Sequence, residues 1–566
     1  MEIPSYVEKI IDQYWQPIIK IVGKQLKKYY FEQVEPEHWL VEFDKFFDTS
    51  YLEQECASYH QGSGQGSWTI HPIKCLVRGL LAKYLYNTSY RETETMVKYN
   101  ILVRLWVGYG LFEQVFDHTT LQRFEMWVLL KHNLLFFDEI VKQIDKQHQT
   151  KHRELQVIDT FGMLGRAIEQ NVIVLLRQVA QYLLKALEKD LADTKRAIEA
   201  ELNNEALFGE EDEKPTNLLR KAERIKRLQT VGEQVIHLQA MVASLEPSLL
   251  ATHPGVKQWQ ACLSKIIADH LKIRTTQNQA GVSISITELS NKKEEKEQKG
   301  SYCILSANDL EMTLRVHGKG KAIVGYNASV MSDEFYVRHT QVDTGAQPDQ
   351  AALADVFKHY QKHNHPLPKK MSGDMAYGHG KTRALVAGIT QGQTTIVAKC
   401  PDYDKRTNRF TPSDFILDDS DPRQPSLTCP NKVTTTTVSR DKNGDGFDFR
   451  FSAKMCRACP LFIKCRGEKG NPNGRRTVYF SYYRSFLKEA HQYNQTEQGQ
   501  TELKQRSVIE RHIFNLTNLF GARRAKSYGL VKANFQLRMA AMAFNIRQFL
   551  RYGTGEQKPK PQPATG

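Results

Sequence analysis

The stretch Leu155-Gln-Val-Ile-Asp-Thr160 determines which fold class we expect for this chain. It is a short apolar run that ends at Asp159, which is the pattern of a buried strand. Helical patterns flank it, because apolar residues recur at helical spacing from Ile73 to Leu85 and from Leu175 to Leu187. Further strand-like runs lie at 302–305, 321–327, 335–342 and 394–399, and a helix is expected at 349–363. The sequence therefore predicts a mixed α/β fold.

The chain length of 566 residues suggests about three or four modules, at roughly 100–200 residues per domain. Hydrophobic residues make up 40% of the chain, so each module can bury a core. We expect a flexible connector at 61–67 and a charge-rich linker at 291–300, with a long C-terminal helical region starting near Thr501. The expected modules are a helical region at 1–150, a core at 151–399 and 471–552, a helical insertion and linker at 167–300, a Cys-rich insertion at 400–470 and a disordered tail at 553–566.

The charge balance favours an anionic partner. Lys and Arg number 78 against 63 Asp and Glu, which gives a net charge of +15. Much of this excess lies between Thr501 and Tyr552, where ten Lys and Arg accompany two acids. Nucleic acid is the first partner that such basicity indicates. No run of 18 or more apolar residues and no secretory signal pattern occurs, so we expect no membrane association and a cytoplasmic, nucleoid-associated protein.

Three carboxylates stand out by their positions: Asp159 at a strand, Asp374 before a Gly-rich turn, and Glu510 on a helix among cations. If they converge, they repel one another unless cations lie between them. Hard divalent ions such as Mg²⁺ or Mn²⁺ suit oxygen ligands of this kind. Two such ions stabilise the attacking and leaving oxygens of a phosphoryl displacement. The alternative for Glu510 is a surface ion pair with Arg506, four residues earlier on the same helix edge.

Five of the nine cysteines crowd into the segment from Cys400 to Cys465. Cys456-Arg-Ala-Cys459 has the spacing of a metal knuckle, and Cys465 and Cys429 would complete a tetrahedral Zn²⁺ site. Cys400 is an alternative to Cys429. Free thiols in a β-rich insertion, or a redox pair at the CxxC, are the other interpretations.

Several motifs in order along the chain resemble those of the DDE-type transposases of bacterial insertion sequences. The resemblance covers most of residues 70–552 outside the helical insertion. The motifs are Ser89-Tyr-Arg-Glu92, Asp117-His-Thr-Thr-Leu-Gln-Arg-Phe124, Val157-Ile-Asp-Thr160, Ser306-Ala-Asn-Asp309, Gly325-Tyr-Asn327, Gly373-Asp-Met-Ala-Tyr377, Arg506-Ser-Val-Ile-Glu510, Ala522-Arg-Arg-Ala525, Gly529-Leu530 and Asn545-Ile546. Relatives in one subgroup carry a similar Cys-rich insertion before the catalytic Glu.

This resemblance implies a ribonuclease-H-like α/β core preceded by a helical DNA-binding domain, with a helical insertion after Asp159 and a small β, Cys-rich insertion after Asp374. Asp159, Asp374 and Glu510 would hold two Mg²⁺ ions, and a water activated by these ions would cleave the strand at the element's ends. The freed 3′-OH would then attack target DNA.

DNA is the partner expected on this account, both as terminal repeats and as target, and a homodimer on DNA is expected. Arg506 is the leading candidate for a phosphate contact, and the other expected DNA-binding cations are Arg123, Arg511, Arg523, Arg524 and Lys526. Two other functions fit the same residues: a nuclease of the same fold that cuts without joining, and a non-catalytic or decayed DNA-binding copy.

Overall fold

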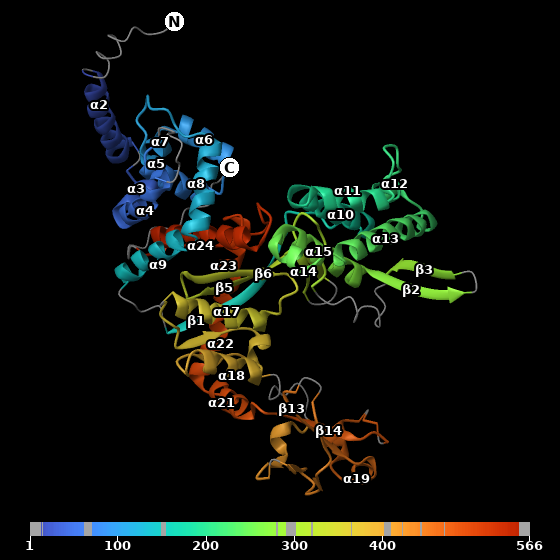
Figure 1. Ribbon diagram of the computed structural model, residues 1–566. Coiled ribbons are helices and arrows are strands. Elements are labelled where there is room, and N and C mark those ends of the chain that lie inside the picture. Colours follow the sequence, from blue (N-terminus) through green and yellow to red (C-terminus); the bar gives the residue numbers. More distant parts are fainter. Residues whose placement is uncertain are drawn as a thin grey trace.

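A computed structural model describes residues 13–61, 71–148, 154–278, 281–289, 302–317, 321–363, 365–400, 409–468 and 470–553, apart from 14, 35, 422, 442–443 and 472. Within these ranges, no helix is long and apolar enough to span a bilayer. Most of the connector expected at 61–67, the linker at 291–300 and nearly all of the tail at 553–566 lie outside the described residues. The chain is a mixed α/β protein with a helical N-terminal region, as the sequence predicted (Figure 1).

A six-stranded mixed sheet lies at the centre, in the order β4-β5-β1-β7-β8, and β6 pairs with β5 as well. β1 is antiparallel to β5 and parallel to β7, and β7 is parallel to β8. The strands are β1 (Leu155–Leu164), β4 (Thr313–His317), β5 (Lys321–Ser332), β6 (Val337–Thr344), β7 (Lys370–Ser372) and β8 (Thr395–Val397). The strand predicted at 155–160 is therefore present but extends further than predicted. Pairing with β5 continues β1 to Leu164, so Asp159 lies inside the strand and not at its end.

Side chains on β1 alternate between two cores, one on each face of the sheet. Val157 and Met163 belong to a core shared with the N-terminal helices and the C-terminal helices α23 (Ser507–Asn518) and α24 (Leu530–Tyr552). Ile158 belongs to a core formed with α17 (Asp349–Lys362) and α18 (Gly380–Ile389). This alternation places Asp159 on the face that carries α23. The helix predicted at 349–363 is confirmed by α17.

The N-terminal region is a set of helices that packs onto α24 (Figure 1). Two of its helices begin at capping residues that lie close to their partners in the sequence. Ser89 and Glu92 form a reciprocal capping box at the start of α6, and Asp117 accepts a hydrogen bond from the backbone N–H of Thr120 at the start of α8. The helices are α2 (Gln16–Tyr29), η2 (Tyr30–Val34), α3 (Trp39–Phe46), α4 (Ser50–Cys56), η3 (Ala57–Gln61), α5 (Ile73–Leu85), α6 (Tyr90–Tyr99), α7 (Ile101–Val107), α8 (His118–Lys131) and α9 (Leu135–His148).

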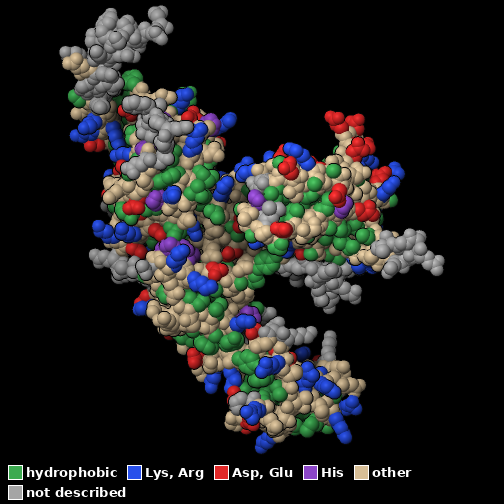
Figure 2. Space-filling view, viewed as in Figure 1, with side chains coloured by type: hydrophobic (Ala, Val, Ile, Leu, Met, Phe, Trp, Pro, Cys, Tyr) green, Lys and Arg blue, Asp and Glu red, His purple; other side chains and the backbone are tan. Residues whose placement is uncertain are grey.

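A helical arm projects from the sheet after β1 and has its own core (Figure 1). It comprises α10 (Val172–Asp190), α11 (Ala192–Glu201), α12 (Asn204–Phe208), η5 (Thr216–Leu218), α13 (Lys221–Ala243), α14 (Pro247–Thr252), α15 (Pro254–His270), β2 (Leu271–Asn278) and β3 (Gly281–Glu288). Acidic side chains gather at the tip of the arm (Figure 2), and Glu210, Glu211 and Asp212, which follow α12 in the sequence, are exposed. The hairpin β2–β3 adds two paired strands to the segment at 167–300, for which we expected only helices and a linker.

The prediction of a strand at 302–305 is wrong. This stretch forms no ladder, and Ile304 instead packs into the core of the arm. Its apolar residues are buried by tertiary contacts rather than by sheet pairing, a difference that a short apolar run does not reveal.

The described residues of the Cys-rich segment fold into two small three-stranded sheets, two short α-helices and one 3₁₀ turn. These elements are η7 (Pro412–Asp414), β9 (Ile416–Asp418), β10 (Ser426–Thr428), β11 (Thr434–Thr435), β12 (Val438–Arg440), β13 (Gly446–Phe451), α19 (Ala453–Arg457), α20 (Phe462–Arg466) and β14 (Arg476–Ser481). Beyond β14 the chain becomes helical at α21 (Arg484–Asn494) and α22 (Glu497–Gln505), so the C-terminal helices begin earlier than the predicted position near Thr501.

Candidate functional site

Asp159 lies in the middle of β1, and its side chain is 23% exposed. The backbone N–H of Thr160 donates a hydrogen bond of 2.8 Å to Asp159 Oδ1. Burial raises the pKa of Asp159 above its usual value, and the charges of Asp374 and Asp349 raise it further, although Thr160 and Arg506 act in the opposite sense. Asp159 is thus a carboxylate that the fold holds at an electrostatic cost.

Asp374 follows β7 by two residues, and Ser372 of β7 lies beside Val157 of β1 in a parallel pair. Asp374 Oδ1 accepts a hydrogen bond of 2.8 Å from the backbone N–H of Ala376, which starts the 3₁₀ turn η6 (Met375–Gly378). Parallel pairing therefore brings the second acid next to the first, consistent with the effect of Asp374 on the pKa of Asp159.

Glu510 reaches this region on α23, which packs against the sheet through the fully buried side chains of Ile509 and Leu516. Arg506 stands at the break between α22 and α23. Its Nη2 lies 3.0 Å from Glu510 Oε1, and its Nη1 lies 3.8 Å from Asp159 Oδ2. The ion pair that we considered between Arg506 and Glu510 is present, and the same guanidinium also faces Asp159.

The donor chemistry of these residues suits a hard divalent cation, because all three are carboxylates and two of them repel each other. As the side chains stand, no group of three or more His, Cys, Asp or Glu within the described residues is arranged to hold a metal ion. The geometry accounts for this, since the Glu510 side chain is 59% exposed and pairs with Arg506. Arg506 neutralises part of the charge that a cation would otherwise neutralise.

Further polar residues surround Asp159 that sequence reasoning did not select as site residues. Asp349 accepts a hydrogen bond of 2.8 Å from Asn327 Nδ2 and lies 3.7 Å from Arg315 Nη1. Arg315 Nη2 also donates to the hydroxyl of Thr160, at 2.9 Å. Asn327 belongs to the motif Gly325-Tyr-Asn327, so that motif was the signal that could have identified this cluster.

Tyr377 was also missed by the sequence reasoning, although it ends the motif around Asp374. Its side chain is 1% exposed, and its hydroxyl has no hydrogen-bond partner among the described residues. Burial raises the pKa of Tyr377 well above its usual value, and Asp349, Asp159 and Asp374 raise it further. The phenol therefore stays protonated beside the carboxylates.

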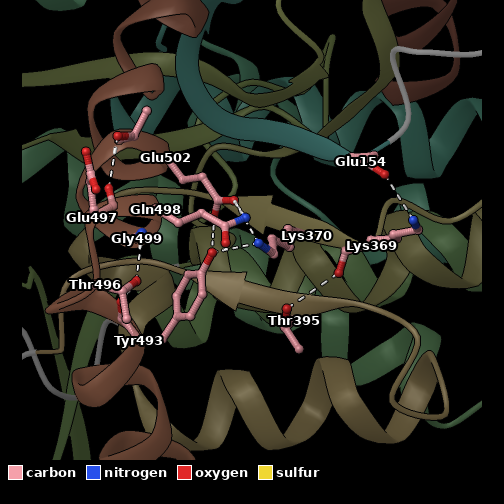
Figure 3. A network of polar contacts seen from close by, with 11 residues as sticks. Glu154, Lys369, Lys370, Thr395, Tyr493, Thr496, Glu497, Gln498, Gly499 and Glu502 are labelled. Atoms are coloured by element: carbon pink, nitrogen blue, oxygen red, sulfur yellow. Dashed lines mark hydrogen bonds and ion pairs between the residues drawn. The ribbon is translucent and has the colours of Figure 1, made fainter.

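A polar network ties the strand before Asp374 to the helix before Arg506 (Figure 3). Lys370 Nζ lies 2.7 Å from Glu502 Oε1 and 2.6 Å from the hydroxyl of Tyr493, which donates to Glu502 Oε2. Burial lowers the pKa of Lys370, but the hydrogen bonds from Lys370 to Glu502 and Tyr493 outweigh it and raise the pKa overall. Lys370 precedes Asp374 by four residues and Glu502 precedes Arg506 by four, so this network links the backbone segments that carry both site residues.

Cys429, Cys456, Cys459 and Cys465 line one cavity of about 40 Å³. Burial raises the pKa of Cys456, and the neighbouring Cys465, Cys459 and Cys429 raise it further. Cys400 lies elsewhere, 3.6 Å from Arg383 Nη2 and 3.8 Å from Asn494 Nδ2. The fold thus brings the four cysteines of the knuckle prediction together and leaves Cys400 apart.

The candidate DNA-binding cations lie in three places. Arg511 is exposed on α23, next to Glu510, and Arg123 is exposed on α8 near Tyr59. Arg523, Arg524 and Lys526 follow α23 in a loop that meets the end of β1, where the backbone N–H of Leu164 donates to the carbonyl of Arg523.

Two family models match separate parts of the chain. A transposase DDE domain matches residues 428–550, which include Glu510, Arg506 and the four clustered cysteines but neither Asp159 nor Asp374. A second transposase domain, of otherwise undefined function, matches residues 28–126 in the N-terminal helices. No curated protein and no solved structure matches the chain. Both matched segments are similar to transposase domains, and together they indicate a DDE-type insertion-sequence transposase.

Proposed function

We propose that the chain is an active transposase, which binds the ends of its mobile element, cuts the DNA strand there and joins it to target DNA. The observation that carries this proposal is the approach of Asp374 to Asp159 across a parallel strand pair, with Arg506 between Asp159 and Glu510. Two carboxylates that repel each other, with a third linked to the first through Arg506, are costly for folding alone. Such an arrangement is expected at a catalytic site, where bound divalent cations would neutralise the repulsion between the carboxylates.

The proposed fold of the core is ribonuclease-H-like. It is supported by the sheet, in which antiparallel β4, β5 and β6 precede the parallel strands β7 and β8, with α17 and α18 on one face. The proposed division of the chain is that of the sequence analysis: a DNA-binding region at 1–150, a core at 151–399 and 471–552, and insertions at 167–300 and 400–470.

Asp159, Asp374 and Glu510 would hold the Mg²⁺ or Mn²⁺ ions. Such ions, when bound, lower the pKa of water and neutralise charge on a phosphodiester. The protein's own residues would do the rest. Arg506 would exchange its pairing with Glu510 for the scissile phosphate, because a guanidinium matches phosphate oxygens in a two-point geometry. Arg315 would hold Asp349 and Thr160 in place beside Asp159.

The test of this function is Glu510→Gln, which removes one carboxylate charge and preserves side-chain size. A labelled duplex ending in the terminal DNA of the encoding element should be cut by the wild type with Mg²⁺ or Mn²⁺. It should be bound but not cut by the variant. Glu489→Gln, which changes an exposed acid on α21, is the matched control and should cut normally. Normal cutting by Glu510→Gln would refute the role of Glu510.

The same assay separates the three candidate functions. Joining of pre-cut ends to a target plasmid supports a transposase, and cutting without joining supports a nuclease. Binding with no cutting in Mn²⁺ supports a non-catalytic copy. Sedimentation of the complex with DNA tests the proposed homodimer, which would hold two ends together.

The Cys-rich segment is proposed to hold a structural Zn²⁺ ion through Cys429, Cys456, Cys459 and Cys465, because four thiols share one small cavity. Elemental analysis of purified protein should find about one zinc per chain. The Cys456→Ser variant should lose it, and Cys400→Ser should keep it. Zinc-free wild-type protein that stays folded would favour free thiols.

A further inference from the structure

A cleft of about 810 Å³ lies between the N-terminal helices and the loop that follows α23, and we call it the interlobe cleft. One wall comes from α5, α6 and α8, and the other from residues 521–527, Arg166 and the start of α24. The walls touch where Lys526 Nζ lies 3.1 Å from Asn87 Oδ1. The cleft thus joins the two segments that match separate transposase domains.

Six cations line this cleft against two carboxylates, and both acids already have partners within the protein. The backbone N–H of Ser89 donates to Glu92 at 2.7 Å, and Glu125 pairs with Lys83 at 2.8 Å. The other five cations form no ion pair with any described residue; they are Arg166, Arg523, Arg524, Lys526 and Lys532. The cleft therefore carries positive charge that the protein itself does not neutralise.

The lowered pKa of Lys526 is a second indication of excess positive charge in the cleft. Burial lowers its pKa, and the nearby charge of Lys83 lowers it further, against weaker opposing effects of Glu125 and Glu92. An anion placed in the cleft would relieve this repulsion. Arg523 and Arg524 are exposed at the same wall and free to reach it.

The cleft also has a fixed position relative to the carboxylates, because β1 connects the two. The backbone N–H of Leu164 donates to Arg523 O at 3.0 Å, and that of Ala525 donates to Leu164 O at 2.8 Å. Leu164 is five residues beyond Asp159 on the same strand. At about 3.4 Å per residue this is about 17 Å, which equals about five base-pair steps of duplex DNA.

From this geometry we infer that the interlobe cleft binds the phosphate backbone of duplex DNA about five base pairs from the phosphodiester held at Asp159. This inference rests on the proposed function, since it takes DNA as the substrate of the carboxylate site. The cleft would hold the terminal DNA with both lobes at once, which sets the position of the cut without reading bases there.

The first experiment measures binding of a labelled terminal duplex in metal-free buffer as a function of salt. Arg523→Gln with Arg524→Gln removes two unpaired cations, and only their backbones contact β1, so the fold is expected to persist. The slope of log K against log salt should become shallower by about 1.8, at about 0.9 per lost phosphate contact. The control, Lys185→Gln with Lys257→Gln, removes two exposed charges from the helical arm and should leave the slope unchanged.

The second experiment neutralises single phosphates of the duplex with methylphosphonates. Substitution four to six base pairs from the cut should weaken binding by the wild type but not further weaken binding by the Arg523/Arg524 variant. An unchanged salt slope, or sensitivity at other positions, would overturn the cleft assignment while leaving metal-dependent cutting intact. Tighter binding of an RNA duplex or an acidic polypeptide, lost in the same variant, would overturn the assignment to DNA. Failure of the wild type to cut would refute the proposed function without altering the salt slope.

Discussion

The substitution Asp159→Asn is expected to stabilise the metal-free protein while abolishing its catalysis. Burial and the charges of Asp374 and Asp349 raise the pKa of Asp159, so the native state binds this proton more tightly than the unfolded chain does. Stability that is present at acidic pH is therefore lost as the pH rises through the native pKa. At pH 7 the ionised carboxylate of Asp159 destabilises the folded wild type. The Asn side chain carries no charge, so it avoids this cost, and it still accepts the hydrogen bond from the backbone N–H of Thr160.

The size of this effect follows from the charges around Asp159. Two carboxylates about 6 Å apart would repel by about 3 kcal/mol at an effective dielectric constant of about 20. The contact to Arg506, at 3.8 Å between part-exposed groups, offsets about 0–1 kcal/mol of this. A net gain of about 2 kcal/mol corresponds to about 4–8 °C for a unit of 150–250 residues.

Thermal unfolding in EDTA at pH 7 is the assay for Asp159→Asn, repeated with Mn²⁺. The variant should melt above the wild type in EDTA, and Mn²⁺ should raise the melting temperature of the wild type more. Asp355→Asn, at an exposed acid of α17, is the control and should change little. Melting of Asp159→Asn at or below the wild type in EDTA would show that the ionised carboxylate carries no penalty.

Three further changes test the scaffold of the site. Lys370→Met should lower the free energy of unfolding by about 1–3 kcal/mol, because it leaves the largely buried carboxylate of Glu502 without its ammonium partner. Urea unfolding should show that adding Glu502→Gln restores part of this loss. No restoration would argue against the network. Burial lowers the pKa of His359 to about 4, and the charge of Arg538 assists, so His359 alone should lower wild-type stability by roughly 2 kcal/mol as the pH drops from 6.5 to 5. A His359→Asn variant whose stability falls as far as that of the wild type would contradict this. Gly325→Ala should abolish soluble expression, because a Cβ there would lie 2.1 Å from a backbone oxygen of β1. Gly388 has open space around it, so Gly388→Ala should be neutral or stabilise the protein by up to about 1 kcal/mol. Equal expression and stability of the two variants would refute the packing argument.

Much of the local structure was predictable because its causes lie within a few residues. The capping box of Ser89 and Glu92 and the cap at Asp117 are short side-chain to backbone contacts, and sequence spacing alone indicates them. The helix at α17 and the strand at β5 follow from apolar periodicity in the same way. Local sequence patterns are therefore enough to predict the N-terminal helices and the mixed α/β class.

Strand lengths and sheet membership were less predictable, because they depend on partners far away in the chain. β1 continues to Leu164 since β5 and the segment around Arg524 pair with it, and no local pattern signals either partner. The hairpin β2–β3 forms a separate two-stranded sheet within the segment at 167–300, where we expected only helices and a linker. The stretch at 302–305 has strand-like residues but meets the core of the arm instead of a sheet edge.

Composition and motif order alone determined that this chain is a basic, mixed α/β protein with three separated acids that are candidates for catalysis. Tertiary structure decided the environment of each acid: which neighbours raise the pKa of Asp159, and that Arg506 faces both Asp159 and Glu510. It also decided that Arg315 and Asp349 join the cluster and that a basic cleft opens beside the end of β1. The physical reason is that charge interactions and burial depend on distance in space, and residues hundreds of positions apart become neighbours only when the sheet and α23 assemble.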